Sequence, residues 1–205
     1  MLKEKIKTLA QKYKDEFTAV RRHLHTHPEL SYQEFETSAF VQTKLKTFGI
    51  PFTVMAETGV VGLIEGKNPS SRIIALRADM DALPIHEENE VPYKSIKEGI
   101  MHACGHDVHT TCLLGAAKIL NELKSEWEGT VKLIFQPGEE RNPGGASYMI
   151  RDGVLENPKP QYIFGLHVHP GLPTGKLSFR GGKVMASADD SGQNIFESTP
   201  SPGRR

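Results

Sequence analysis

Apolar residues recur every three or four positions over the first 24 residues, which is the spacing of one face of an α-helix. The residues of this stripe are Leu2, Ile6, Leu9, Tyr13, Phe17, Val20 and Leu24. The pattern predicts one amphipathic helix over this segment. A second helix is predicted to begin at a capping-box pattern, Ser31 followed by Glu34, and to end before Gly49.

Short apolar runs rich in β-branched residues alternate with helical patterns along the rest of the chain. These runs predict buried strands at 59–66 (GVVGLIEG), 72–79 (RIIALRAD), 130–136 (TVKLIFQ) and 162–168 (YIFGLHV). Helices are predicted over about 108–123 and directly after the Gly-rich turn NPGGAS. The alternation predicts an α/β fold in which a mostly parallel sheet is covered on both faces by helices.

Polar residues follow three of these strands closely. The pairs are Asp79 and Asp81, Glu139 and Glu140, and His167 and His169. In an open α/β sheet, the crevice outside the carboxyl ends of the strands is the expected active site. The three segments are therefore predicted to converge on one place.

The balance of charges argues against nucleic acid and anionic membranes as partners. The chain has 205 residues, and 25 Lys and Arg offset 25 Asp and Glu, so no net field attracts nucleic acid or an anionic membrane. We expect a small-molecule substrate. The amino terminus is charged, and no stretch approaches the roughly 18 apolar residues of a membrane span. Two cysteines are too few for a disulfide scaffold, which favours a reducing, cytoplasmic setting.

The segments MHACGHDVH (101–109), FQPGEE (135–140) and GLHVHP (165–170) offer the side chains of a metal site. Zinc and similar ions accept thiolate, imidazole and carboxylate, and a mixed donor set is available in Cys104, His106, Glu140 and His167. The Cys104 thiolate is suited to bridging two ions. One carboxylate of the Glu139–Glu140 pair can bind metal while the other takes a proton from metal-activated water, which predicts hydrolysis of an amide or similar acyl bond.

Several of these residues have simpler interpretations. Taken alone, the Glu139–Glu140 pair favours a solvated acidic turn, and Cys112 falls in a stripe that predicts a buried core residue. Asp107 suits a helix N-cap as well as a ligand. Asp81 either orients a ligating imidazole or caps the turn before Pro84. Six further histidines stay unassigned, three of them in the segment HLHTHPE: His23, His25, His27, His102, His109 and His169.

A family resemblance adds to this interpretation. Seven segments between Arg21 and Asp189 resemble, in order and spacing, the co-catalytic metallopeptidase relatives that include bacterial N-acyl-amino-acid amidohydrolases, hippurate hydrolase and the plant auxin-conjugate hydrolases. The segments are RRHLHTHPELSYQEFET, ALRADMDALPI, MHACGHDVHT, FQPGEE, GGASYMI, FGLHVHP and GGKVMASAD. The resemblance implies an aminopeptidase-like α/β catalytic domain, an N-acyl amino acid substrate and two divalent metal ions, usually manganese or zinc, with cobalt also suited to the site.

The resemblance also implies roles for residues that match the family's motifs. Cys104 would bridge the two metals, with the further ligands His106, Glu140 and His167. Glu139 would act as general base and later as acid. Asp81 is expected to support the site, and Asp79 is expected to be no ligand.

Members of this family are about twice as long. They carry a lid, through which they dimerise, inserted after the segment that matches MASAD, and a last metal-binding histidine follows it. We therefore interpret residues 1–189 as the amino-terminal part of the catalytic domain and 190–205 as an atypical tail, frameshifted or disordered. The sheet is expected to expose an apolar edge and face.

Two alternatives stay open at this point. One is a catalytically inactive fragment that binds metal weakly. The other is a thiol enzyme that uses Cys104 with a nearby histidine, which the sequence disfavours because it leaves the Glu139–Glu140 pair and His167 without a role.

Overall fold

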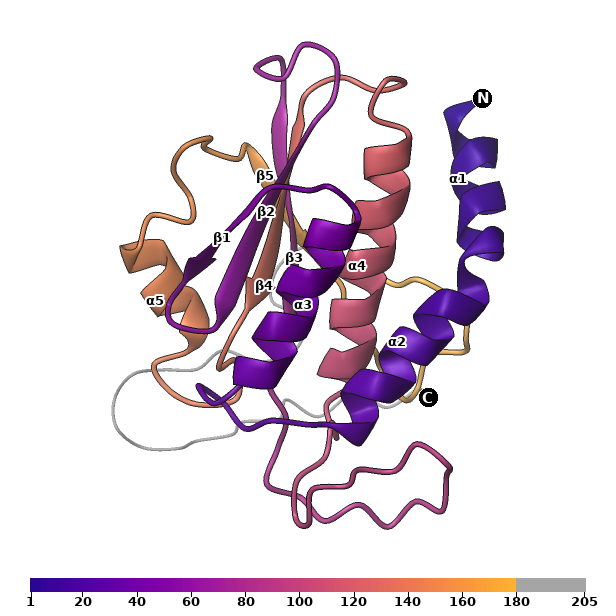
Figure 1. Ribbon diagram of the computed structural model, residues 1–205, viewed down its shortest axis with the longest axis vertical. Coiled ribbons are helices and arrows are strands. Elements are labelled where there is room, and N and C mark those ends of the chain that lie inside the picture. The colour runs from indigo at the N-terminus through magenta and orange to yellow at the C-terminus, as the bar shows by residue number, and fades with distance from the viewer. Residues whose placement is uncertain (180–205) are drawn as a thin grey trace, which may run out of the picture. The chain divides into compact units, whose positions relative to one another are not determined.

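The computed structural model describes residues 1–179, which form five helices and five strands (Figure 1). The helices are α1 (Leu2–Lys12), α2 (Lys14–Thr26), α3 (Phe35–Thr47), α4 (His106–Glu122) and α5 (Gly145–Arg151). The strands are β1 (Phe52–Met55), β2 (Gly59–Glu65), β3 (Ile73–Asp79), β4 (Thr130–Gln136) and β5 (Tyr162–Gly165). All of them belong to one compact unit, Met1–Val168, and a second unit begins at His169. The tail predicted at 190–205 lies outside the described residues.

The strands form a single sheet in the order β1-β2-β4-β3-β5. Strand β3 pairs parallel with both β4 and β5, whereas β2 pairs antiparallel with both β1 and β4. The α/β class is therefore confirmed. The expected mostly parallel pairing holds in the half of the sheet formed by β4, β3 and β5, and the other half is antiparallel, so the sheet is mixed.

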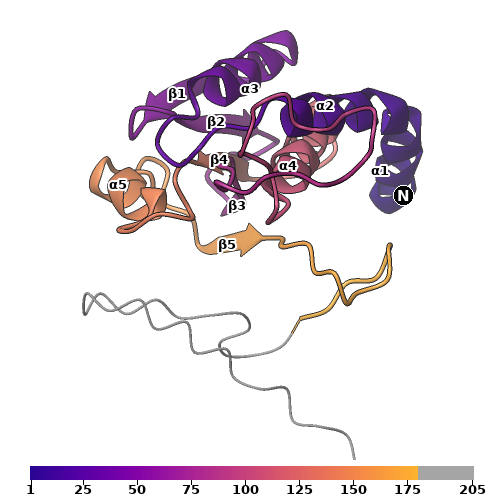
Figure 2. The ribbon, with the colours of Figure 1, turned by 90° about the horizontal axis from the view of Figure 1, so that it is seen from below.

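Helices cover the two faces of this sheet unequally (Figure 2). Helices α2, α3 and α4 lie over one face, and their core includes Val41, Leu45, Leu114 and Phe135, all fully buried. On the other face, α5 contributes to a smaller cluster of Val61, Ala75, Ile134, Met149 and Val154. The large core on the first face is the main source of hydrophobic stabilisation.

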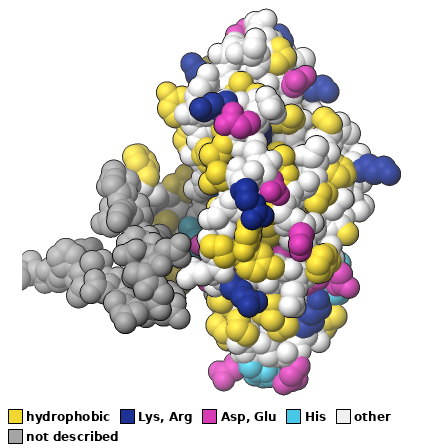
Figure 3. Space-filling view, turned by 90° about the vertical axis from the view of Figure 1, so that its left-hand side faces the viewer, with side chains coloured by type: hydrophobic (Ala, Val, Ile, Leu, Met, Phe, Trp, Pro, Cys, Tyr) yellow, Lys and Arg dark blue, Asp and Glu magenta, His cyan; other side chains and the backbone are white. Residues whose placement is uncertain are grey.

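In the part of the chain that the structure describes, strand β5 lies at one edge of the sheet. Tyr162, Ile163 and Phe164 are 62%, 50% and 56% exposed, which confirms the expected apolar edge. Apolar patches interleaved with charged side chains are also visible on the face of the molecule drawn in Figure 3. Within residues 1–179, no helix has both the length and the apolar character needed to cross a bilayer.

The predicted first helix is in fact two helices that meet at Tyr13. This residue has φ −94° and ψ 5°, and its hydroxyl donates to Glu122 at 2.5 Å. Its ring packs with Ile119 and Leu123 at the end of α4. The apolar stripe continues across the joint, which is why its periodicity did not reveal the break.

The predicted capping box is wrong. Helix α3 begins at Phe35, and Glu34 occupies its N-cap position without a side-chain capping hydrogen bond. Ser31 donates instead to Asp81 Oδ2 at 2.6 Å. Glu34 is fully buried and accepts hydrogen bonds from the backbone N–H of Gly138 (2.7 Å) and the hydroxyl of Thr58 (2.9 Å). Both side chains therefore hold loops at the carboxyl ends of strands.

Candidate metal centre

Four segments meet where the parallel strands end. Strands β3, β4 and β5 run in one direction, so the polar residues that follow them lie at the same edge of the sheet. A long connection, residues 80–105, leads to the start of α4 (Figure 1). It contains an isolated bridge between Leu83 and Met101, and another joins Ala82 to Leu30. Cys104 lies two residues before that helix, separated from it by the N-cap Gly105, and His106 is its first residue.

The predicted ligands form two groups that share His106. Donor atoms of Cys104, His106 and His167 lie within 4.8 Å of one another, as do those of His106, Glu139 and Glu140. Cys104 Sγ is 3.4 Å from His167 Nε2. The structure thus brings together all the residues that the sequence proposed as ligands or base.

The two ring nitrogens of His106 differ: Nδ1 has a hydrogen-bond partner and Nε2 has none. The side chain is fully buried, and its Nδ1 lies 3.2 Å from Asp81 Oδ1. Its Nε2 has no hydrogen-bond partner and faces Glu140 Oε1 at 3.7 Å and Glu139 Oε2 at 3.9 Å. Buried polar atoms rarely lack partners, and metal-bound imidazoles usually have their second nitrogen on a carboxylate. His106 therefore fits a metal ligand.

The surrounding charges act strongly on His106. Burial alone lowers the pKa of its imidazole. The hydrogen bond with Asp81, the nearby Cys104 side chain and the charge of Asp79 outweigh burial, and together they raise this pKa to about 11. The cluster is therefore an electrostatic environment that attracts a cation, and a metal ion would replace the proton on His106.

Asp81 connects three segments of the site. It is buried, accepts hydrogen bonds from Ser31 Oγ (2.6 Å) and the backbone N–H of Glu140 (2.9 Å), and also faces His106. Although burial opposes ionisation, these hydrogen bonds lower the pKa of Asp81. Of the two interpretations left open by the sequence, this geometry matches an orienting carboxylate.

The two adjacent glutamates differ in exposure. The side chain of Glu139 is 42% exposed and that of Glu140 is 23% exposed. Burial, followed by the negative charge of Glu140, raises the pKa of Glu139. A raised carboxyl pKa suits a group that must both take and return a proton near neutral pH.

Asp79 and His109 form a buried pair beside the site. Asp79 Oδ1 lies 2.6 Å from His109 Nδ1, and Arg77 donates to its other oxygen at 2.6 Å. Burial raises the pKa of Asp79, but His109, His106 and Arg77 lower it far below its usual range. Asp79 Oδ2 is 3.6 Å from His106 Nε2, so this carboxylate borders the metal cluster.

Two residues differ from their sequence interpretation. Asp107 is not the N-cap of α4, because Gly105 occupies that position. Its carboxylate binds His25 Nδ1 at 2.7 Å and Arg21 Nε at 2.8 Å instead. Cys112 is exposed rather than buried, because it lies on the outward face of α4.

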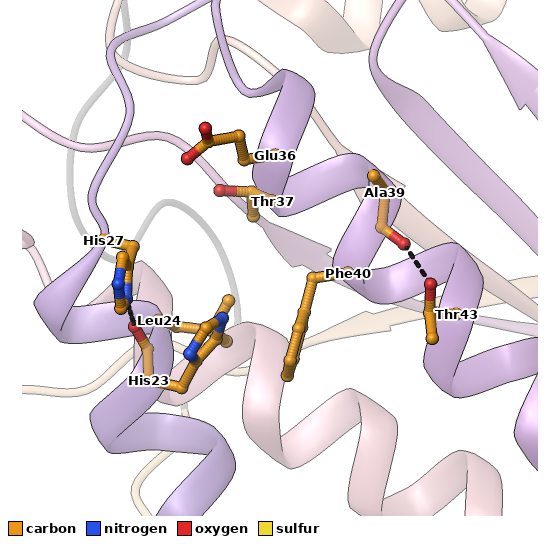
Figure 4. Close-up of a pocket in the computed structure, with 8 residues that line it drawn as sticks. All are labelled: His23, Leu24, His27, Glu36, Thr37, Ala39, Phe40 and Thr43. Carbon is orange, nitrogen blue, oxygen red and sulfur yellow. Dashed lines mark hydrogen bonds between the residues drawn. The ribbon is translucent and has the colours of Figure 1, made fainter.

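The remaining histidines lie outside the donor cluster. His23 and His27 line a cavity of about 370 Å³ between α2 and α3, where the His23 ring stacks on Phe40 with centroids 4.5 Å apart (Figure 4). His102 is buried, and neither of its ring nitrogens has a hydrogen-bond partner. His169 belongs to the second unit, where its Nδ1 accepts the backbone N–H of Gly171 at 3.1 Å.

Sequence reasoning missed the contributions of Ser31, Arg77 and His109 to this region. His109 lies three residues after His106, which places both on one face of α4 and was the available signal. Ser31 and Arg77 carried no such signal, because their contacts depend on the arrangement of loops and strands in space.

The fold and the donor cluster define a class: an α/β protein with a candidate metal-binding site at the carboxyl ends of its parallel strands. The chain belongs to Peptidase family M20/M25/M40, whose pattern matches residues 75–195. This is a family of hydrolases, and homologues named as amidohydrolases indicate that amide bonds are among their targets.

Individual relatives agree with this assignment. The chain is 44% identical over 190 residues to an N-acyl-L-amino acid amidohydrolase of Geobacillus stearothermophilus, covering 92% of this chain and 50% of the relative. It is 50% identical over 176 residues to the IAA-amino acid hydrolase ILR1-like 5 of Arabidopsis thaliana, covering 85% of this chain and 39% of the relative. The chain thus spans about half the length of the curated relatives it matches.

A solved structure supports the fold. The Bacillus subtilis YXEP protein, described as a dinuclear metal binding peptidase from the M20 family, superposes with a TM-score of 0.81 at 41% identity. The match covers 86% of this chain and 49% of that one.

Proposed function

We propose that this chain carries the metal site of an enzyme that hydrolyses the amide bond of N-acyl amino acids. The observation that carries the proposal is the buried Nε2 of His106, which has no hydrogen-bond partner and faces the Glu139 and Glu140 carboxylates. The names of the amidohydrolase relatives support the substrate class.

The donor set suits two divalent ions. Cys104, His106, Glu140 and His167 would supply ligand atoms to these ions. Manganese, zinc or cobalt suits these donors. When bound, such ions supply Lewis acidity and lower the pKa of bound water to about 7.

The protein's own residues would perform the proton transfers. Glu139 would take a proton from the attacking water and return it to the leaving amine, and its raised pKa supports this role. Asp81 would keep the proton on the Nδ1 side of His106, so that Nε2 is directed at the metal.

The setting of the whole protein is part of the proposal. Cys104 and Cys112 are both free thiols, which supports a reducing cytoplasmic location. The balanced charge supports a small-molecule substrate without nucleic acid or membrane partners. Dimerisation would use the lid, which relatives carry after the segment that matches MASAD.

The test is manganese- and zinc-dependent hydrolysis of N-acetyl and N-benzoyl amino acids, with dipeptides in the same panel. Glu139→Gln is expected to lower kcat by at least roughly 10²-fold, the contribution of a general base, while metal stays bound. The control is Glu65→Gln, because Glu65 is exposed at the end of β2, and it should leave turnover unchanged.

Three results would count against the proposal. Full turnover by Glu139→Gln would show that Glu139 does not transfer the proton. Cleavage of dipeptides alone would reject the N-acyl substrate class. Metal bound but no substrate cleaved would favour the catalytically inactive fragment, as the sequence left open.

A further inference from the structure

His109 uses both of its ring nitrogens. It is 3% exposed, with Nδ1 2.6 Å from Asp79 Oδ1 and Nε2 2.9 Å from the backbone nitrogen of Val168. A backbone N–H can only donate, so Nε2 is the acceptor and the proton of the ring lies on Nδ1, where it is donated to Asp79. With both nitrogens occupied, His109 is not free to bind a metal.

The Asp79 end of this arrangement is rigid. Arg77 donates to the second oxygen of Asp79 at 2.6 Å, and the hydroxyl of Thr110 donates to its backbone carbonyl at 2.7 Å. Asp79 is also the last residue of β3, paired with Gln136 on β4. His109 is therefore attached to a fixed point of the sheet.

The Val168 end packs against the turn that precedes α4. Gly105 lies there between Cys104 and His106, with φ +87°. A Cβ at Gly105 would come within 2.3 Å of Val168 Cγ2, so glycine is what allows this close approach. Val168 is thus held by a hydrogen bond and by a packing contact.

Val168 in turn holds His167. The Nδ1 of His167 donates to the carbonyl oxygen of Val168 at 2.7 Å, which leaves Nε2 directed at Cys104. The ladder between β5 and β3 ends at Gly165, two residues before His167. The His167 ring also lies edge-to-face against the rings of His109 and His106, with centroids 4.6 Å and 6.2 Å apart. Among the described residues, the backbone beside His167 is attached to the site through the N–H of Val168.

We propose that His109 is a positioning residue that holds the ligand His167 in place by accepting the backbone N–H of Val168, with Asp79 fixing the ring. This inference rests on the proposed metal site, because it assigns His167 as a ligand. It also gives the buried Asp79–His109 pair a role that does not involve binding metal.

Two substitutions at His109 separate its two hydrogen bonds. Asn places an amide near the Nδ1 position, so His109→Asn can keep the bond to Asp79 but loses the acceptor for Val168. Gln reaches the Nε2 position, so His109→Gln can keep that acceptor but loses the bond to Asp79. The control is His86→Asn, because the His86 side chain is 60% exposed.

The first measurement is hydrogen exchange of the Val168 amide in metal-free protein, and the second is affinity for Co²⁺. In His109→Asn, Val168 should exchange roughly five- to tenfold faster, as expected for one lost hydrogen bond. Co²⁺ affinity should fall roughly 10- to 100-fold, as for other residues that orient a ligand. Both values should stay near those of the parent in His86→Asn. They should fall between the parent and His109→Asn in His109→Gln, which keeps the acceptor but loses the bond with Asp79 that fixes it.

Unchanged Val168 exchange in folded His109→Asn would overturn the proposal, whatever the metal data show. Faster exchange with unchanged Co²⁺ affinity would overturn the link to His167. If the parent does not bind Co²⁺, the proposed metal site fails, while the exchange data still decide the His109 contact. If His109→Asn does not fold, Val168→Pro removes the same N–H donor with His109 intact, and the same loss of Co²⁺ affinity is expected.

Discussion

Two clusters of buried histidines and carboxylates flank the first turn of α4. They differ in whether both ring nitrogens of the central histidine have a hydrogen-bond partner. In the first, His25 has Asp107 on Nδ1 at 2.7 Å and Glu87 on Nε2 at 3.1 Å. Arg21 completes this cluster through Asp107. In the second, His106 has Asp81 on Nδ1 and no hydrogen-bond partner on Nε2.

The difference separates a structural histidine from a candidate ligand. The His25 cluster joins α2, the 80–105 connection and α4, and its central imidazole has no nitrogen left for a metal. The His106 cluster keeps one buried nitrogen facing carboxylates, which leaves a position for a cation. Similar side chains therefore serve stability in one cluster and are available for chemistry in the other.

The largest expected effect is the loss of stability when His25 is removed. His25→Ala leaves the carboxylates of Asp107 and Glu87 without their shared partner, and breaking a buried charge pair in this way costs about 3–5 kcal/mol. Urea unfolding of metal-free protein measures the change. His86→Ala, at an exposed histidine, should stay within about 0.5 kcal/mol of the parent. If His25→Ala also lost no more than about 0.5 kcal/mol, the His25 cluster would not be structural.

At His106, the main expected effect of substitution is a loss of metal affinity. If four ligands share the roughly 10–16 kcal/mol of a structural zinc site, one ligand accounts for about 2.5–4 kcal/mol, so His106→Gln should weaken metal binding by on the order of 10²–10³-fold. Its unfolding free energy without metal should also fall, because Asp79 and Asp81 lose the imidazolium that they stabilise. Metal affinity, which His25→Ala should leave unchanged, is what separates the two variants. Metal titration and urea unfolding of both variants test this. A stability loss equal to that of His25→Ala, with metal affinity intact, would reverse the comparison.

The sequence predicted which polar segments come together better than it predicted the connections around them. The segments with Cys104, His106, Glu140 and His167 could be recognised because each follows a strand or opens a helix, where α/β sheets place their polar residues. Strands β2, β3 and β4 were predicted closely for a similar reason, since their apolar runs are long and uninterrupted.

The errors fall where a local pattern was overruled by a distant contact. Ser31 and Glu34 have the spacing of a capping box, but Asp81 and Gly138 provide their partners in the folded chain. Asp107 suits an N-cap by its position, but Arg21 and His25 bind it from α2. No local pattern contains these partners, because they lie tens of residues away in the chain.

The smallest effect concerns His102, which is buried with no partner on either nitrogen. Burial lowers the pKa of His102 to about 4, whereas the hydrogen bond with Asp107 raises the pKa of His25 despite burial. The two should therefore act oppositely on stability. The contribution of His25 is complete below about pH 6.5 and is lost as pH rises through its folded pKa.

For His102 the sign is reversed. Between about pH 6.5 and 4, the unfolded chain binds a proton on His102 that the folded chain does not, so acidification should lower the unfolding free energy by up to about 3 kcal/mol. Urea unfolding at several pH values in this window, compared between the parent and His102→Asn, isolates this contribution because Asn does not titrate. His86→Asn should keep the parent's slope. Parallel curves for the parent and His102→Asn would show that the pKa of His102 is the same in the folded and unfolded chains. A parent that gains stability relative to His102→Asn on acidification would place His102 with His25.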